Sequence, residues 1–275
     1  MRRLFFIALT SLVALFGGCT EGSSADDQLG AEILSITTDA SVWFDVEGGS
    51  GEIGYEVENA TNATRVSALS AEAWITDVVV GQTISYRVTR NDSSVVRRGR
   101  IRVACGESEQ VVYVMQHPSR DNSKMSTLNS DYEFNIEGGI FVGAYVGDYF
   151  GTGCNTCQVY LWEDLDLVTG EERGDTFQLD LQLPLGGQDI CGVYTEGTSE
   201  GHFLAGTAEN VGGQYMQQNT WYMAADYSAF APLKRGTITV ESSNNVDYTF
   251  TLDLYDDYGY RVHGVFVGYG EFTEW

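Results

Sequence analysis

The chain has 275 residues, a formal net charge of −24 and 32 glycines beside 3 prolines. An acidic surface of this kind repels the phosphates of nucleic acids, which excludes nucleic-acid binding as a function. The length suits two domains behind a short N-terminal leader.

The first 18 residues have the pattern of an export signal. Two arginines precede an apolar run over residues 4–16, which is too short to span a bilayer. Two glycines and Cys19 follow, and small residues before a cysteine resemble the lipobox of bacterial lipoproteins. The resemblance implies cleavage before Cys19 and lipid on that cysteine, which would anchor the protein to a membrane. An ordinary signal peptide over residues 1–18 is the alternative.

Residues 19–30 are small and polar, and they predict a flexible tether. The acidic residues among them resemble export signals that send lipoproteins of the Bacteroidetes to the cell surface. We therefore expect the protein at the outer membrane, held by its lipid and facing outward.

Residues 31–118 predict the first folded domain. Short β-branched and aromatic runs, separated by Gly, Asn, Asp and Ser, predict an all-β chain. About seven such strands in this span are typical of an immunoglobulin-like β-sandwich. Pro118 ends the domain, since proline cannot continue a central strand.

Five features of this span occur in a set order: a Trp-Ile pair at 74–75, a strand at 84–88, Asn91, an Arg-x-x-Ile motif at 98–101 and a last strand ending in Gln116. Together they resemble the BACON domain (Bacteroidetes-associated carbohydrate-binding, often N-terminal). The resemblance implies a two-sheet β-sandwich in a surface protein that handles glycans. Trp74 is then a candidate sugar-stacking residue, although a Trp-Ile pair that opens a strand also suits a core position.

A basic stripe crosses this acidic protein at Arg98, Arg100 and Arg102, which alternate along one strand. One interpretation is a solvated sheet face with acidic cross-strand partners. The other is a docking face, either for the more acidic second domain or for an anionic glycan.

Residues 119–124 predict a polar linker, and residues 125–275 predict a second all-β domain with about ten strands. Both a jelly-roll sandwich and a closed barrel accommodate this number, and we favour a larger antiparallel, jelly-roll-like sandwich. The cleanest alternation sets five apolar residues on one face: Val246, Tyr248, Phe250, Leu252 and Leu254.

Three cysteines of the second domain are candidates for a disulfide, because exported thiols normally oxidise. Cys191 could pair with Cys154 or with Cys157, or the last two could form a local bridge. Zinc held by the three cysteines and a histidine such as His202 is a further alternative.

The acidic segment of Asp253, Asp256 and Asp257 is a candidate site for structural Ca²⁺, which takes six to eight oxygen ligands. The alternative is a solvated acidic loop. No spacing among the carboxylates is diagnostic of a glycosidase pair.

Aromatic residues alternate with amides near residue 220. Tyr215, Trp221 and Tyr222 lie in one predicted strand with Asn219 and two glutamines, Gln217 and Gln218. Aromatic faces cover the C–H groups of a sugar and amides bind its hydroxyls, so this segment predicts a sugar-binding surface. Core packing of the same rings is the alternative.

The sequence therefore predicts a non-catalytic, surface-anchored lipoprotein that captures carbohydrate. A structural lipoprotein that binds protein partners in an outer-membrane complex is the second hypothesis. An unrecognised glycoside hydrolase or lyase is the third, although the chain has no nucleophile or metalloprotease motif.

Overall fold

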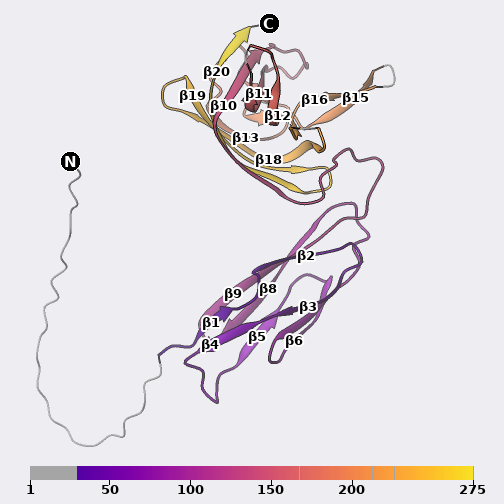
Figure 1. The fold of residues 1–275 in the computed structure, drawn as a ribbon, viewed down its shortest axis with the longest axis vertical. Helices are drawn as coiled ribbons and strands as arrows, with labels where there is room; N and C mark the ends of the chain where they lie inside the picture. The colour runs from indigo at the N-terminus through magenta and orange to yellow at the C-terminus, as the bar shows by residue number, and fades with distance from the viewer. Residues whose placement is uncertain (1–29, 167, 212–213, 226, 275) are drawn as a thin grey trace, which may run out of the picture.

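The computed structural model describes residues 30–166, 168–211, 214–225 and 227–274. These residues form β-strands joined by turns and loops, which confirms the all-β class. Figure 1 shows two bodies joined end to end. Within the described ranges no helix is long and apolar enough to cross a membrane. The expected signal peptide, the tether and Cys19 lie outside these ranges.

The first body contains two facing sheets and a separate strand pair. The four-stranded sheet has the order β2 (Ser41–Phe44), β9 (Ser108–Gln116), β8 (Arg97–Cys105), β5 (Val66–Leu69). The three-stranded sheet has the order β3 (Gly49–Ile53), β7 (Ile84–Val88), β6 (Ile75–Val80), and β1 (Ile33–Ile36) pairs with β4 (Tyr55–Glu58). Buried residues of both sheets form one apolar cluster, so the first body is a two-layer β-sandwich as predicted.

Gln116 joins the edges of this sandwich. Its side-chain amide lies in the interior and donates to the backbone carbonyls of Asp45, Val46 and Thr89 at 3.2, 3.1 and 2.9 Å. Buried backbone carbonyls need such partners, so Gln116 closes the end of the last strand as the sequence predicted.

The second body is one sheet that closes on itself. Its long strands are β10 (Tyr132–Tyr145), β11 (Asn155–Leu165), β12 (Glu172–Leu183), β18 (Phe230–Ser242), β19 (Asp247–Asp256) and β20 (Arg261–Glu274). The order β11-β10-β20-β19-β18 is continued by the short strands β13 (Gly192–Glu196) and β14 (His202–Phe203) to β12, which pairs back with β11. A further short strand, β17 (Trp221–Met223), also joins β12 to β18.

The predicted jelly-roll-like sandwich is therefore wrong, and the sheet is a closed barrel. The prediction of antiparallel pairing also fails at two places, because the short strands β13 and β14 are parallel and, along their whole length, so are β10 and β20. The two strands approach closely at Gly264, where a Cβ atom would overlap the carbonyl oxygen of Phe134. Glycine permits this approach.

The alternation of residues along each strand determines which side chains face the core of the barrel and which face outward. Tyr248, Phe250, Leu252 and Leu254 of β19 all lie in the core, as predicted. Val246 lies before the strand and is exposed. The same period of two applies to β11 and β12, whose apolar residues face inward.

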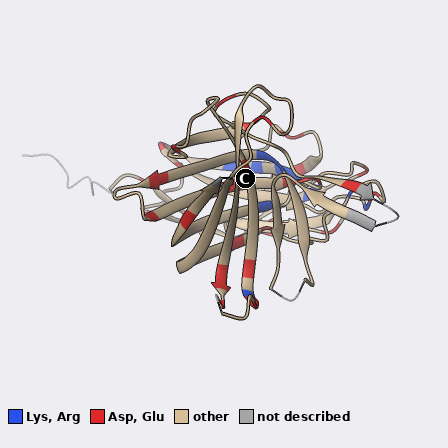
Figure 2. Ribbon diagram, turned by 90° about the horizontal axis from the view of Figure 1, so that it is seen from above, with Lys and Arg blue, Asp and Glu red and all other residues tan. Residues whose placement is uncertain are grey.

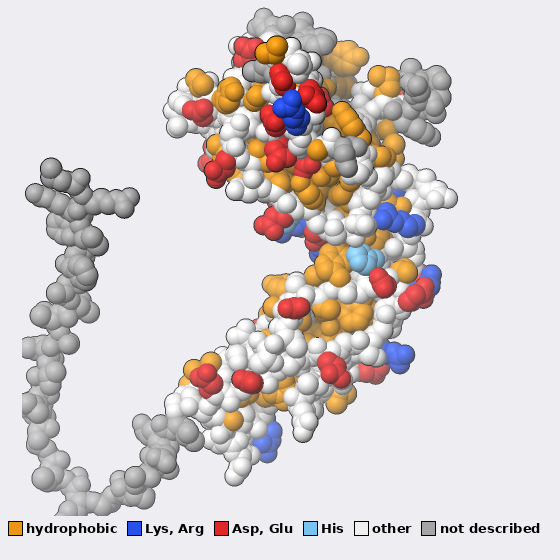
Figure 3. Space-filling model, viewed as in Figure 1, with side chains coloured by type: hydrophobic (Ala, Val, Ile, Leu, Met, Phe, Trp, Pro, Cys, Tyr) orange, Lys and Arg blue, Asp and Glu red, His pale blue; other side chains and the backbone are white. Residues whose placement is uncertain are grey.

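The two bodies meet at the turn between β19 and β20. The backbone N–H of Val96 donates to the carbonyl of Tyr258 at 2.7 Å, and the His117 ring is 2.9 Å from the hydroxyl of Tyr260. Trp43 stacks on His117 with ring centroids 4.8 Å apart. The two hydrogen bonds connect residues of different bodies, so specific packing joins the bodies in addition to the linker. Figure 3 shows the narrow waist where the two bodies meet.

Arg98 is the central polar contact of this joint. Its guanidinium donates to the carbonyl of Gly259 at 2.7 Å and to the carboxylate of Asp131 at 2.6 Å. It also lies over the rings of Trp43 and Tyr255, 5.9 and 5.4 Å from their centroids. The docking interpretation of the basic stripe is confirmed for this arginine.

Arg98→Ala is expected to loosen the joint. The free energy that holds the two bodies together should fall by about 1–3 kcal/mol, because charge-assisted hydrogen bonds and ring contacts are lost. Small-angle scattering should show a broader range of separations between the bodies. Arg102→Ala is the matched control, since Arg102 pairs with Glu109 inside its own sheet. An unchanged scattering profile for Arg98→Ala would contradict the assignment.

Candidate functional site

The aromatic surface predicted near residue 220 is not exposed. Trp221 is 0% and Tyr222 is 2% exposed. The Trp221 indole N–H donates to the carbonyls of Thr207 and Gln218 at 2.9 and 2.8 Å, and the Tyr222 hydroxyl is 3.4 Å from the carboxylate of Asp175. The prediction of these two residues as a sugar platform is therefore wrong, because a sugar ring cannot reach their faces.

The single strand predicted in this region is two strands. A turn at Asn219, with φ of 68°, separates β16 (Gln214–Gln218) from β17. The Asn219 amide donates to the carbonyl of Ala205 and to the Thr207 hydroxyl, at 3.2 and 3.3 Å, so its amide nitrogen bonds to protein groups. Tyr215 lies on β16, and its side chain is outside what the structure describes.

Trp74 is half-buried and packs against the core of the first body. The guanidinium of Arg97 lies over its ring at 5.8 Å from the centroid. This position matches the core alternative more closely than an open stacking platform.

The three aspartates of the predicted calcium site are kept apart by separate bonds. Asp253 pairs with Arg261 at 2.7 Å. Buried Asp256 accepts the backbone N–H of Tyr260 at 2.7 Å, and Asp257 accepts that of Met125 at 2.7 Å. No group of three or more metal-ligating side chains occurs in the described ranges. The calcium prediction is therefore wrong for these residues.

The cysteines form no disulfide in the described residues. Cys157 points into the barrel core, whereas Cys154 precedes β11 and its sulfur lies 3.9 Å from the carbonyl of Thr198. Side chains three apart on an extended chain point to opposite faces, which excludes a local bridge. Cys191 is exposed at the start of β13. The predicted disulfide is not present.

A polar layer covers the outer face of β11 and β12. The strand register places Gln158 opposite Asp180, and Tyr160 opposite Gln178. Gln182 continues the layer and donates to the Thr156 hydroxyl at 3.0 Å. Although outward-facing, Gln178, Asp180 and Gln182 are buried, so other segments must cover this face.

Those segments leave a pocket of about 460 Å³, which we call the glutamine pocket. Four glutamines come from three strands, and the remaining wall is aromatic or apolar: Gln158, Gln178, Gln217, Gln218, Tyr160, Tyr149, Phe150 and Val146. Tyr149 is 78% exposed and meets Phe150 edge to face at 5.1 Å. Trp162 stacks behind Tyr160 at 5.7 Å. The pocket therefore combines open aromatic surface with amide donors and acceptors.

Asp180 lies behind this pocket. Its carboxylate is 0% exposed, and one oxygen accepts the Gln158 amide N–H at 3.2 Å. The other oxygen has no partner within the described part of the chain. Burial raises the pKa of Asp180 to about 6, although hydrogen bonds from Gln158 and Gln178 oppose the rise.

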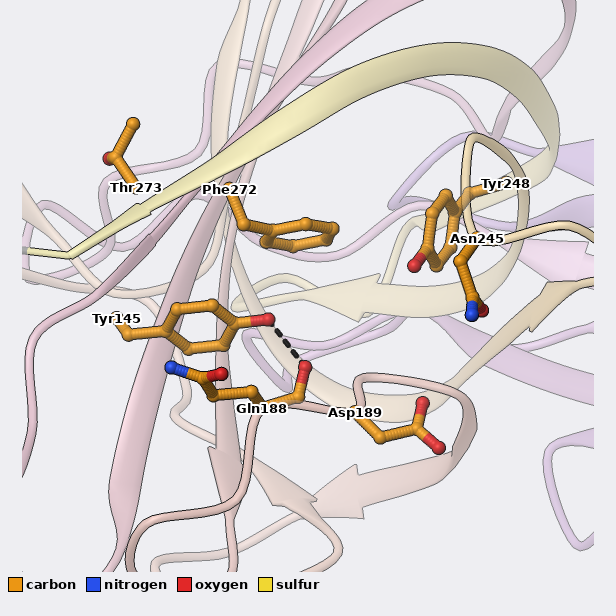
Figure 4. Close-up of a pocket in the computed structure, with 7 residues that line it drawn as sticks. All are labelled: Tyr145, Gln188, Asp189, Asn245, Tyr248, Phe272 and Thr273. Atoms are coloured by element: carbon orange, nitrogen blue, oxygen red, sulfur yellow. Dashed lines mark hydrogen bonds between the residues drawn. The ribbon is translucent and has the colours of Figure 1, made fainter.

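A second pocket, of about 530 Å³, lies at the mouth of the barrel formed by the ends of β10 and β20 and the start of β19, and Figure 4 shows its lining residues. Tyr145 and Phe272 stack at 5.4 Å there, and Tyr248 meets Phe272 edge to face. The Tyr145 hydroxyl donates to the carbonyl of Gln188, beside Asp189. The lining of this mouth pocket includes the carboxylate of Asp189, whereas the described lining of the glutamine pocket is uncharged.

Acidic residues are distributed around the barrel, as Figure 2 shows in the view along its end. Residues 121–275 hold 24 acidic and 5 basic residues, a net charge of −19. None of the described residues that line the glutamine pocket is charged. The pocket is therefore suited to a neutral ligand.

Comparison with known proteins gives weak similarities only. No family model and no curated protein matches the chain. A Bacteroides ovatus xyloglucanase solved with a heptasaccharide is 16% identical over 37% of this chain and 26% of its own, with a TM-score of 0.25. A Bacteroides thetaiotaomicron protein is 13% identical over 36% of this chain and 98% of its own, also with a TM-score of 0.25. A titin immunoglobulin tandem is 10% identical over 90% of this chain and 100% of its own, with a TM-score of 0.26.

This chain spans about a quarter of the xyloglucanase. TM-scores this low establish no common fold. The sequence predicts Gln217 and Gln218 as ligand-binding amides, but it groups them with Trp221 and Tyr222, whereas the rings beside them in the pocket are Tyr149, Phe150 and Tyr160. Two signals could have located the pocket: the aromatic pair at 149–150 between glycines, and the outward polar series Gln178, Asp180, Gln182.

We expect alkylation of the native protein to modify Cys191 quickly and the buried thiols of Cys105, Cys154 and Cys157 only after unfolding, since reactivity requires access. Mass spectrometry of the peptides would identify each modified site. Two cysteines recovered as a disulfide-linked peptide would contradict the free-thiol assignment.

We expect Asp180→Asn to raise stability at neutral pH. A carboxyl group whose pKa is raised in the folded state binds more protons there than in the unfolded state. The stability of the fold is therefore highest below the ordinary pKa of 3.8 and falls as pH rises through about 6. At neutral pH this pKa shift corresponds to a loss of about 3 kcal/mol in the free energy of unfolding, as an upper bound. Denaturant unfolding at pH 4 and pH 7 would measure it.

Asp256→Asn is the matched control, because burial also raises the pKa of Asp256 to about 6. Each substitution should remove the part of the pH dependence of stability that its own carboxyl group contributes. An equal loss of stability in Asp180→Asn at both pH values would instead mean that the carboxylate is needed for packing.

Proposed function

We propose that this protein is a surface-anchored, non-catalytic lipoprotein that captures carbohydrate, and that the glutamine pocket is its sugar site. The observation that carries the proposal is the composition of this pocket. Amide side chains can bind hydroxyls as donors or acceptors, and aromatic rings can cover the apolar face of a sugar.

The geometry of the pocket supports binding rather than bond cleavage. Its lining contains no carboxylate, and Asp180 lies behind the glutamines. Glycoside hydrolysis ordinarily uses two carboxylates that flank the bond. Tyr149, by contrast, is open to solvent at the rim, where it can meet a polymer chain.

The N-terminal part of the sequence supports the proposed setting. The lipobox-like segment would attach Cys19 to the outer membrane, and the BACON resemblance of residues 31–118 is consistent with a glycan-handling surface protein. The first body would then act as a spacer that holds the barrel away from the membrane.

A scaffold in an outer-membrane complex is the second candidate function. The joint around Arg98 favours it, because specific hydrogen bonds hold the two bodies end to end. Such a joint suits a protein that presents one surface at a set distance from another. Co-purification of a defined protein partner without any sugar binding would support this candidate.

Affinity electrophoresis against a β-glucan, a galactan, a mannan and polygalacturonate tests the proposed function. The protein is expected to be retarded by at least one neutral polymer. Tyr149→Ala and Gln178→Ala should each weaken that interaction about three- to tenfold, the effect of losing one ring contact or one hydrogen bond.

Tyr113→Ala is the matched control, because Tyr113 is also an exposed tyrosine but lies on β9 of the first body. Trp74→Ala reports on a site in the first body. Loss of binding with Trp74→Ala alone would move the site there. No retardation by any polymer would reject the proposed function.

A further inference from the structure

Asp180 has an unusual environment for a buried charge. It is fully enclosed, one of its oxygens has no partner in the described residues, and it takes part in none of the ion pairs found there. Its backbone N–H donates to the Thr220 hydroxyl at 3.3 Å. An isolated buried carboxylate is costly, and groups kept at such a cost often serve a site.

The neighbouring amides have only one way to bind this carboxylate. An ionised carboxylate accepts hydrogen bonds and cannot donate them. Gln158 donates its amide N–H to Asp180 at 3.2 Å. Since the amide group is planar, the carbonyl oxygen of Gln158 is turned away from Asp180. Gln158 lines the glutamine pocket, and so does Gln178, which lowers the pKa of Asp180.

We infer that Asp180 is a positioning residue, which holds Gln158 with its carbonyl oxygen toward the pocket and thereby selects neutral, hydroxyl-rich sugars over uronic acids. The inference rests on the proposed function. Sugar hydroxyls can donate to this oxygen. A uronate carboxylate would meet an acceptor with a buried negative charge behind it, which disfavours it.

The surroundings of Asp180 make this orientation sensitive to pH. Among the described residues, the titratable groups that respond to its charge are Cys157 and Tyr160 of β11, and its charge contributes to the raised pKa of both. Neither group is charged between pH 5 and pH 8. Protonation of Asp180 itself would remove its charge and weaken the hydrogen bond that holds Gln158 in this orientation.

The test compares the full chain with its Asp180→Asn variant. The probes are methyl glucoside, methyl galactoside and methyl mannoside, with glucuronate and galacturonate as the matched acids, and binding is measured by ligand-observed NMR titration at pH 5 and pH 8. The unmodified protein should bind a neutral glycoside about tenfold more weakly at pH 5 than at pH 8. It should bind the uronates more weakly than the neutral sugars at pH 8.

Asp180→Asn should weaken neutral-sugar binding about fivefold to tenfold at pH 8, remove the pH dependence and reduce the discrimination against uronates. Asp256→Asn is the control, because Asp256 is a buried carboxylate with a similar pKa that lies outside the pocket. It should bind like the unmodified protein. Circular dichroism at both pH values establishes that each variant is folded.

The outcomes separate this inference from the function it rests on. If the unmodified protein binds sugar and the Asp180→Asn variant has the same affinity, selectivity and pH profile, the role of Asp180 is overturned and the sugar site stays intact. Absence of binding to every probe and every polymer overturns both. A pH dependence that Asp256→Asn also abolishes would mean that general stability, rather than amide orientation, controls binding.

Discussion

Closure of the sheet is the constraint on which the second body depends. In a closed sheet each strand has one face toward the core and the other toward the outside. The apolar residues of β11 and β12 fill the core, so the polar residues between them have to face outward. Closure therefore explains why Gln158, Gln178 and Asp180 lie together on one face. That face becomes a pocket where β16 and the segment that holds Tyr149 and Phe150 cover it.

The sequence pattern predicted the two-layer form of the first body and most of its strands, although this body has nine strands where about seven were expected. In β19 it identified the core residues correctly, because a period of two is a local property of the chain. It could not predict closure, which depends on β10 pairing with β20 across most of the domain. A sandwich and a barrel have the same local pattern, so the sequence alone left this choice open.

The candidate site was harder to predict than the fold. Trp221 and Tyr222 had the composition of a binding surface, but a turn at Asn219 carries them into the barrel wall. The amides of the preceding strand do line a pocket. Their aromatic partners come from a loop about 70 residues earlier in the chain. Contacts between segments so far apart depend on tertiary structure, which propensity and alternation do not report.

The parallel seam between β10 and β20 also has a consequence for how the protein folds. These strands are the first and last of the barrel, separated by more than a hundred residues, so their pairing carries a large loop-closure entropy. Until the final strand arrives, the growing sheet has two unpaired edges that can join other chains. Synthesis of the whole chain therefore has to finish before those edges are covered, and a copy truncated before β20 would be prone to aggregate.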